Sequence, residues 1–308
     1  MSSAPSTTVT PEARQKATKA AAVILPVVVL LAAGLAIAGG SGGATVGGAA
    51  GGIGVFALCV ALAFIVQWLA YVPAYLRQTE TFYDLTGALT HIGVVVLAFL
   101  LTPNPDVRSI VLTAMVVLWA ARLGSFLVTR IRKAGHDDRF DVIKPSAPRF
   151  LVAWTLQGLW IAMTQAAALA AITGTTRAPI DVVTVVGLVL WLAGFGMEVV
   201  ADAQKRTFSA DPANKGRFIG TGLWAWSRHP NYAGEILLWV GIALIALPVL
   251  SGLQLVTLIS PVFVALLLIK VSGVPMLEAK ADKRWGGQPD YEAYKARTPV
   301  LVPRPPRG

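Results

Sequence analysis

One stretch of the sequence, residues 215–235, concentrates side chains that can do chemistry, and it reads KGRFIGTGLWAWSRHPNYAGE. Lys215, Arg217 and Arg228 can hold phosphates, because cations make charge-assisted hydrogen bonds to phosphate oxygens. Asn231 and Glu235 can hydrogen-bond a ribose or an amide. Glu235 already lies in the next apolar run, where a carboxylate is unfavourable and indicates a functional site. A loop that only joins two membrane helices does not need this chemistry.

A second set of polar residues lies on the apolar segment that precedes this stretch. Glu198, Asp202 and Arg206 are spaced at i, i+4 and i+8, which puts them on one face of a helix. A salt-bridge ladder accounts for Asp202 and Arg206 but leaves Glu198 among apolar residues unexplained. Carboxylates that face cations suit a nucleotide, with the acids on sugar hydroxyls and the cations on phosphates.

A third set lies upstream, at the ends of two further apolar segments. Tyr83 and Asp84 begin one of them, and Trp119 and Arg122 lie in the next. Asp84 can cap its helix or take part in chemistry, and the sequence leaves both open. Arg122 lies too deep to be unpaired. We expect Asp84 as its partner, either in a structural ion pair or as part of a substrate site.

Two histidines outside these sets are given structural roles. His91 lies two helical turns beyond Asp84, and we expect a hydrogen-bonded core histidine there rather than a catalytic one. His136, with Asp137 and Asp138, lies in a basic loop. Adjacent acids on a loop without a second histidine are weak metal ligands, so no metal site is expected. The single cysteine, Cys59, is expected to be a packed thiol.

The elements that must position these residues are membrane helices. The chain is 55% hydrophobic and 14% charged, and its mean hydropathy is +0.65, which is typical of polytopic membrane proteins. We predict an all-α membrane bundle with about eight spans, or seven if the last two segments do not both cross. The last two form either a tight hairpin or a partly re-entrant element. The expected spans are 20–38, 53–71, 85–101, 109–129, 150–172, 182–200, 236–250 and 253–272.

The basic residues predict the orientation. Only Arg108 and Arg177 lie in loops on one side, and only Arg122 and Lys270 lie within spans. The positive-inside rule therefore predicts a multi-pass protein of the inner (plasma) membrane with both termini cytoplasmic. The net charge of +10 is explained by this distribution, because the basic residues flank spans. Nucleic acid is not an expected partner.

Four regions are predicted along the chain. Residues 1–19 are expected to be a disordered tail, and residues 20–74 form a transmembrane hairpin with a flexible Gly-rich linker at 39–54. Residues 75–303 form the main membrane domain, and residues 304–308 are a short tail. The region from Lys270 to Arg297 is expected to fold as an amphipathic cap over the cytoplasmic end, with a membrane-surface helix as the alternative.

Several blocks of the sequence resemble the steroid 5-alpha-reductase superfamily, and more closely its bacterial membrane branch, catalogued as a domain of unknown function. The resemblance covers about residues 75–303. The block Ser-Arg-His-Pro-Asn-Tyr at 227–232 also occurs in sterol reductases, and isoprenylcysteine carboxyl methyltransferases carry a similar Arg-His-Pro-x-Tyr. The matching blocks are 83–86, 119–130, 139–141, 154–160, 202–235, 273–278 and 291–295.

The resemblance implies an NADPH-dependent reductase of carbon–carbon double bonds, with the cofactor between the cytoplasmic halves of the helices. By position, Asp84 matches a family Glu and Trp119 lies where the family has a Tyr, the two residues that hold a substrate enone. Arg122 matches a nearby Arg. The acid is therefore shorter and the phenol is lost, which argues against a 3-oxo-steroid, because an indole does not readily transfer a proton. The resemblance places Asp202, Arg206, Asn231 and Glu235 at cofactor contacts.

The sequence therefore predicts an NADPH-dependent enzyme of lipid metabolism that reduces a carbon–carbon double bond of a steroid-, sterol- or isoprenoid-like substrate in the bilayer. The alternatives are a membrane methyltransferase that uses S-adenosylmethionine and a non-catalytic lipid-binding protein. The predicted catalytic residues are Asp84, Tyr83, Trp119 and Arg122. The predicted cofactor residues are Glu198, Asp202, Arg206, Lys215, Arg217, Phe218, Trp224, Arg228, His229, Asn231, Tyr232, Glu235, Lys270 and Glu278.

Overall fold

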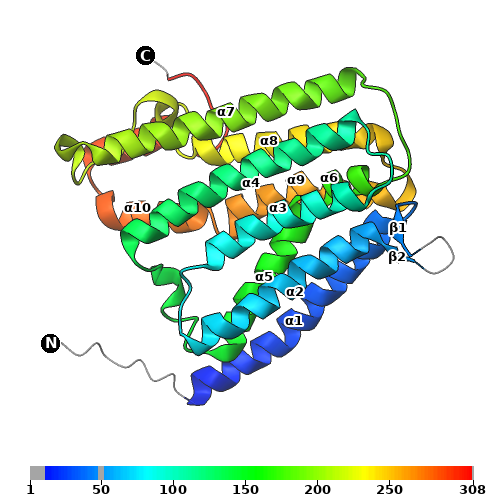
Figure 1. The fold of residues 1–308 in the computed structure, drawn as a ribbon. Helices are drawn as coiled ribbons and strands as arrows, with labels where there is room; N and C mark the ends of the chain where they lie inside the picture. The colour runs from blue at the N-terminus through cyan, green and yellow to red at the C-terminus, as the bar shows by residue number, and fades with distance from the viewer. Residues whose placement is uncertain (1–10, 48–51, 307–308) are drawn as a thin grey trace. The chain divides into compact units, whose positions relative to one another are not determined.

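The computed structural model describes residues 11–47 and 52–306. It consists of helices together with a small two-stranded hairpin (Figure 1). The chain divides into two compact units. Unit 1 is Met1–Arg177 with Val249–Thr257, and unit 2 is Ala178–Pro248 with Leu258–Gly308.

The described part of the chain contains 7 helices that are long and apolar enough to cross a membrane. A bent pair adds an eighth if its two helices count as one span, because α5 and α6 meet at 55°. The predicted all-helical membrane bundle is therefore confirmed. The spanning segments are Gln15–Gly40, Val55–Leu76, Tyr83–Leu101, Val107–Thr129, Val182–Ala210, Pro230–Val249 and Gly252–Trp285.

Unit 1 is a bundle of six helices in the described residues, in which α3 packs on both α2 and α4 (Figure 1). Helix α4 starts where its N-cap, Asp106, accepts a hydrogen bond from Ser109 N at 2.9 Å. Gln165 separates α5 from α6. The elements are α1 (Pro11–Gly40), β1 (Thr45–Val46), β2 (Ile53–Gly54), α2 (Val55–Leu76), α3 (Tyr83–Leu101), α4 (Val107–Ala134), η1 (Asp138–Phe140), α5 (Ala147–Thr164) and α6 (Ala166–Thr173).

Arg108 and Arg177, the two basic residues predicted on the outer side, both lie within electrostatic range of Asp106. Burial would raise the pKa of Asp106, but hydrogen bonds from Ser109 and these two positive charges hold that pKa below its ordinary value. The two arginines therefore stabilise the ionised Asp106 carboxylate at the start of α4, in addition to any role in membrane topology.

Two boundary predictions in unit 1 need correction. Helix α1 begins at Pro11, so residues 11–19 are helical and the expected tail is too long; residues 1–10 lie outside the described residues. The Gly-rich segment is attached to the end of α6, because Ala44 N donates to Thr173 O at 2.7 Å and Thr175 N donates to Gly42 O at 3.3 Å. The flexible-linker interpretation is wrong for that part, while residues 48–51 lie outside the description.

Unit 2 is organised by two helices, α7 and α8, that approach closely through glycines. A Cβ on Gly194 of α7 would lie 2.5 Å from Gly234 O of α8, and a Cβ on Gly241 would lie 2.5 Å from Gly187 O. Each pair of glycines is seven residues, two turns, apart on its own helix, so both contacts lie on one face. Small residues at these positions let the backbones touch.

The remaining elements of unit 2 follow these two helices in sequence (Figure 1). Helix α9 packs on α8, and the choice between a hairpin and a partly re-entrant element stays a prediction. A π-helical turn, Leu267–Val271, continues α9 and contains Lys270. The elements are α7 (Val182–Ala210), η2 (Pro212–Asn214), η3 (Gly222–Ala225), α8 (Pro230–Ala246), η4 (Leu247–Val249), η5 (Gly252–Leu258, mostly in unit 1), α9 (Ile259–Leu266), α10 (Val274–Trp285) and α11 (Pro289–Arg297).

Candidate functional site

The polar stretch 215–235 connects α7 to α8 and folds back on the end of α7. Trp224 Nε1 donates to Ala201 O at 3.0 Å, and Leu223 N donates to Gln204 Oε1 at 2.9 Å. Gly222 adopts φ +60, a left-handed conformation that glycine takes without strain. These contacts place the second half of the stretch beside the last turns of α7.

The C-terminal helices α10 and α11 pack on this stretch. Tyr294 Oη donates to Trp224 O at 2.7 Å, and Trp285 Nε1 donates to Gly216 O at 2.6 Å. The Phe218 ring lies 5.2 Å from the rings of both Tyr291 and Tyr294. Burial raises the pKa of Tyr294 to about 12, so its phenol remains a donor at neutral pH. The two helices are therefore folded against this stretch, and their place at the cytoplasmic end stays a prediction.

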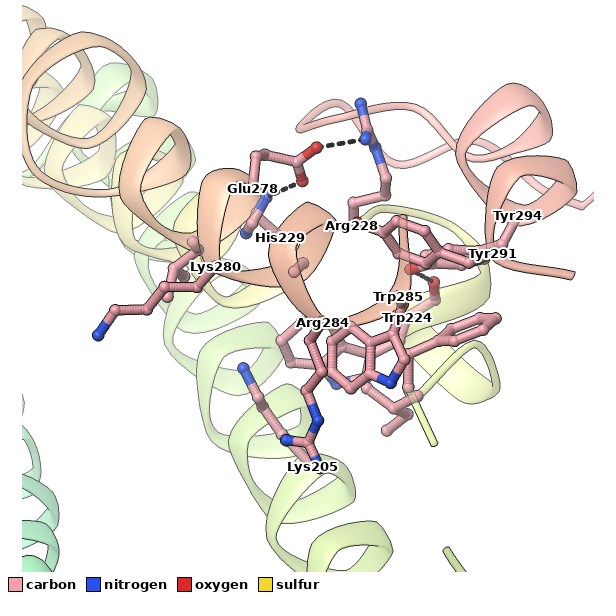
Figure 2. A pocket seen from close by; sticks show the side chains of 14 residues that line it. Lys205, Trp224, Arg228, His229, Glu278, Lys280, Arg284, Trp285, Tyr291 and Tyr294 are labelled. Carbon is pink, nitrogen blue, oxygen red and sulfur yellow. Dashed lines mark hydrogen bonds and ion pairs between the residues drawn. The ribbon is translucent and has the colours of Figure 1, made fainter. Parts of the chain in front are cut away.

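A pocket of about 260 Å³ lies within this arrangement (Figure 2). Aromatic rings supply much of its wall, and four cations border it. Lys205 Nζ lies 4.7 Å from the centre of the Trp224 ring, and the Arg284 guanidinium lies 4.9 Å from that of Trp285. The lining residues are Lys205, Phe218, Ile219, Trp224, Arg228, His229, Leu277, Glu278, Lys280, Ala281, Arg284, Trp285, Tyr291 and Tyr294.

One carboxylate on α10 joins two pocket residues from the start of α8. Glu278 pairs with the Arg228 guanidinium through one oxygen, and its other oxygen lies 2.7 Å from His229 Nε2 (Figure 2). The His229 side chain is only 6% exposed, and its ring stacks on Tyr232 at 5.6 Å. Among the described residues, Arg228 Nε and His229 Nδ1 have no hydrogen-bond partner. Both atoms are buried, so neither is open to a ligand in this arrangement.

Five of the predicted cofactor residues line this pocket: Phe218, Trp224, Arg228, His229 and Glu278. The predicted cations Arg206, Lys215, Arg217 and Lys270 are exposed and are not among its lining residues. Lys205, Lys280 and Arg284, which were not predicted as site residues, line it instead. The spacing of Lys280 and Arg284 at i, i+4 on an amphipathic helix was the available signal.

The predicted residues Glu198, Asp202, Asn231 and Glu235 lie on the facing helices α7 and α8 and are likewise not among the lining residues. Asn231 Nδ2 donates to Asp202 Oδ1 at 3.3 Å. Glu198 is buried, and a Cβ on Gly234 would lie 3.3 Å from Glu198 Cβ. The close approach of the two helices therefore brings Asn231 to Asp202, and the backbone of α8 to Glu198, in a second group.

In unit 1, the ring and hydroxyl of Tyr83 take part in packing. Its Oη donates to Ala153 O at 2.9 Å, and its ring lies 4.9 Å from the rings of both Phe140 and Trp154. Gln157 Nε2 donates to Tyr83 O at 2.9 Å. These contacts join α3 to α5 and give Tyr83 a structural role beside any chemical one.

Trp119 is fully buried and forms an aromatic group with His91 and Trp160. The His91 ring lies 5.1 Å from the Trp119 ring and 4.6 Å from the Trp160 ring, edge to face in both pairs. His91 is a core residue, as predicted, but neither of its ring nitrogens has a hydrogen-bond partner in the described residues. The expected hydrogen bond is therefore wrong, because aromatic rings fill the space around the imidazole.

Asp84 and Arg122 lie on the packed helices α3 and α4. A Cβ on Gly124 would lie 2.6 Å from Ala88 Cβ, so the two helices touch between these positions. Asp84 also acts on Arg139: the hydrogen bonds that Arg139 donates to the Asp137 carboxylate, together with the charges of Asp137 and Asp84, raise the pKa of Arg139 despite its burial. The pairing of Asp84 with Arg122 remains a prediction.

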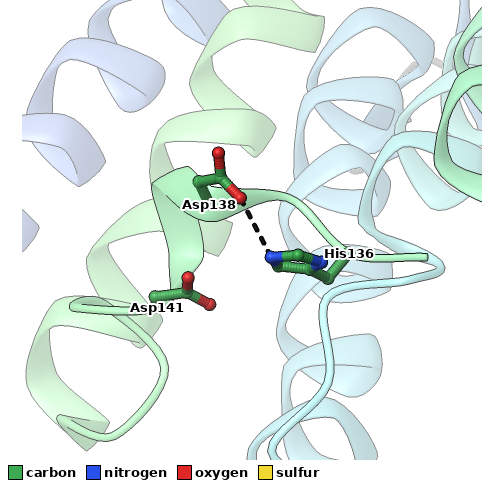
Figure 3. Close-up of side chains that lie close together, drawn as sticks. All are labelled: His136, Asp138 and Asp141. Carbon is green, nitrogen blue, oxygen red and sulfur yellow. Dashed lines mark ion pairs between the residues drawn. The ribbon is translucent and has the colours of Figure 1, made fainter. Parts of the chain in front are cut away.

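His136, Asp138 and Asp141 form a group of possible metal ligands in the described residues (Figure 3). His136 Nε2 lies 2.9 Å from Asp138 Oδ1. All three residues are exposed, and exposed carboxylates with a single histidine hold metal ions weakly. We assign no metal to this group.

Comparison with known proteins gives a family but no activity. Residues 70–298 match the family model described as "Protein of unknown function (DUF1295)". The match covers most of the chain and includes every residue discussed above for the pocket and for the group around Trp119. No curated protein and no solved structure matches the chain. The link to steroid reductases therefore still depends on the motif resemblance alone.

Proposed function

The chain belongs to the DUF1295 family, and we propose that it is a membrane-embedded, NADPH-dependent oxidoreductase. It reduces a carbon–carbon double bond of a lipophilic steroid-, sterol- or isoprenoid-like substrate. The observation that carries this proposal is the unit 2 pocket, in which cations border aromatic walls. The motif at residues 227–232 supports it through the resemblance described above.

The donor set of the pocket fits a nucleotide with phosphates. Lys205, Arg228, Lys280 and Arg284 outnumber the single lining acid, Glu278. A phosphate oxygen accepts strong charge-assisted hydrogen bonds from such groups. The rings of Trp224 and Trp285 provide faces for a base. The Arg228 guanidinium and the His229 imidazole, both held by Glu278, add polar groups to the wall.

The pocket volume limits how much of the cofactor it encloses. Its 260 Å³ lies just below the range of about 300–1,000 Å³ that is common for small-molecule sites. A dinucleotide is larger than this pocket. We therefore propose that it holds the phosphate-bearing part of NADPH, while the nicotinamide extends beyond it.

Reduction also needs a group that polarises the acceptor, and we assign this role to Asp84, Trp119 and Arg122. When bound, NADPH supplies the hydride. Asp84 and Arg122 are both partly buried, on adjacent helices; an acid and a cation so placed can compensate each other, and such a pair can also address a substrate carbonyl. The Trp119 indole N–H is able to donate a hydrogen bond but does not readily transfer a proton. Asp84 is the member of this group that can carry one.

One observation favours a second candidate, a methyltransferase that uses S-adenosylmethionine. That cofactor is smaller than NADPH and matches the volume of the pocket better. Four bordering cations argue against it, because S-adenosylmethionine carries no phosphate.

Ligand titration of the detergent-solubilised protein separates the candidates. We expect NADPH to bind and to raise the unfolding temperature, with affinity falling at high salt because exposed cations are screened. Binding of S-adenosylmethionine without NADPH would favour the methyltransferase. Binding of neither would leave a non-catalytic lipid-binding role.

A further inference from the structure

The last described segment of the chain lies alongside Arg228 and His229, two residues that line the pocket. Arg228 N donates to Pro299 O at 2.9 Å, and His229 N donates to Val300 O at 3.1 Å. Arg304 N donates to Trp226 O at 3.0 Å. Backbone hydrogen bonds thus join residues 226–229 to residues 299–304, more than seventy positions later in the sequence.

Ser227 strengthens this junction from the interior. Its side chain is fully buried, and its Oγ lies 2.9 Å from Leu301 O and 3.3 Å from Val300 O, either of which accepts its hydrogen. The same Oγ accepts a hydrogen bond from His229 N at 3.1 Å. A buried hydroxyl with these partners is costly to remove.

We propose that residues 299–304, here called the C-terminal clasp, are a positioning element of the pocket. The clasp holds the backbone of Arg228 and His229, while Glu278 holds their side chains. The groups of the clasp that accept these hydrogen bonds are backbone carbonyls. The role of the clasp therefore depends on the position of its backbone and only weakly on its side chains.

This placement has a consequence for ligand binding, and that part depends on the proposed function. If the clasp holds Arg228 and His229 where a ligand needs them, a bound ligand must in turn stabilise the clasp, because coupling between two binding events is reciprocal. NADPH should then slow amide exchange at Arg304, which donates to Trp226 O.

The test uses hydrogen exchange on the detergent-solubilised full chain and on a chain that ends at Thr298. Removal of the clasp should speed exchange of the Arg228 and His229 amides by about tenfold or more, the scale of one lost hydrogen bond. Exchange in the Gly-packed centre of α7 and α8 should not change. A peptide of residues 299–308 added in trans should restore the slow rate.

A point variant guards against a truncated chain that fails to fold. Ser227→Ala should speed exchange at His229 in the full chain, and Ser209→Ala, at an exposed serine of α7, should not. Unchanged exchange at residues 228 and 229 in both the truncated chain and Ser227→Ala would overturn the clasp.

Affinity for NADPH then separates this inference from the proposed function. A parent that binds NADPH and a truncated chain that binds about tenfold more weakly support both. Equal affinity in the two chains overturns the positioning role. If the parent binds no NADPH, the proposed function fails, and the exchange result alone decides whether the clasp holds Arg228 and His229.

Discussion

Gly194 of α7 and Gly234 of α8 lie in backbone contact: a Cβ on Gly234 would lie 2.6 Å from Gly194 O. No side chain fits between the helices at this point. The contact lies beside Glu198, the buried acid of α7, since a Cβ on Gly234 would also lie 3.3 Å from Glu198 Cβ. A methyl group at either position would force α7 and α8 apart, so the position of the site on unit 2 depends on these two residues being glycine.

Gly234→Ala should accordingly destabilise the protein by about 1–3 kcal/mol, because overpacking forces the helices apart. Gly196→Ala is the matched control, since a Cβ there meets nothing within 4 Å. Thermal unfolding in detergent measures both. A Gly234→Ala variant as stable as Gly196→Ala would show that α7 and α8 do not pack through these glycines.

Pocket cations should contribute to NADPH affinity according to their burial. Arg228→Ala should weaken binding about ten- to a hundredfold, because a partly buried charged hydrogen bond is worth about 1.5–3 kcal/mol. Arg284→Ala should weaken it about three- to tenfold, because Arg284 is exposed and screened. Calorimetric titration checks both values.

Lys283→Ala provides the control for these two variants. Lys283 lies on the same helix as Arg284 and is exposed, but it is not among the residues that line the pocket. The Lys283→Ala substitution removes one positive charge from α10, as Arg284→Ala does. An equal loss of affinity in Lys283→Ala and Arg284→Ala would assign the effect to net charge and not to the pocket.

Asp84→Asn tests the proposed polarising group. Asparagine caps a helix about as well as aspartate, so a residue that only caps would allow full turnover. If Asp84 orients Arg122 or supplies a proton, turnover should fall while NADPH affinity remains. Steady-state reductase rates and NADPH titration give the two quantities. Parental activity in Asp84→Asn would falsify the catalytic role.

Glu80 should make stability depend on pH. It is buried, accepts from Lys144 Nζ at 2.6 Å and accepts from Asp137 N at 3.0 Å. Burial would raise the pKa of Glu80, but these hydrogen bonds and the Lys144 charge hold it below its ordinary value of 4.5. A depressed pKa stabilises the fold above pH 4.5, and this contribution is lost as the pH falls through the lower folded-state value.

The matched variant is Glu80→Gln, which keeps the shape and an acceptor but removes the charge. It should unfold at a lower temperature than the parent near pH 7, and the gap should close as the pH falls through the folded-state pKa of Glu80, which lies below 4.5. A constant gap across this range would mean that the carboxylate charge is not what stabilises this site.

Orientation in the membrane is the remaining prediction. The basic residues favour cytoplasmic termini, so reporters at Gly47, Asn104 and Thr175 should read outside. Reporters at Ala147 and Ala213 should read inside. Topology reporters in cells measure this directly, and an outside reading at Ala213 would contradict the proposed orientation.

The sequence by itself determined the helices of the bundle and the region of the site. Apolar length is a local property, so the spans could be read from composition alone, including the fifth, which bends at Gln165. The clustering of Arg228 and His229 with aromatic residues also indicated a binding region. The folded cap followed from the amphipathic pattern near Tyr291 and Tyr294.

Only the tertiary structure decided which cations meet in the pocket. Lys205 lines it and the adjacent Arg206 does not, because one residue turns a helix by about 100° and the rotation of α7 is determined by its glycine contacts with α8. Lys280 and Arg284 arrive from α10, which packs on the site through contacts distant in sequence. The clasp could not be predicted from the sequence either, because its hydrogen bonds to Arg228 and His229 join backbone groups, which every residue type carries.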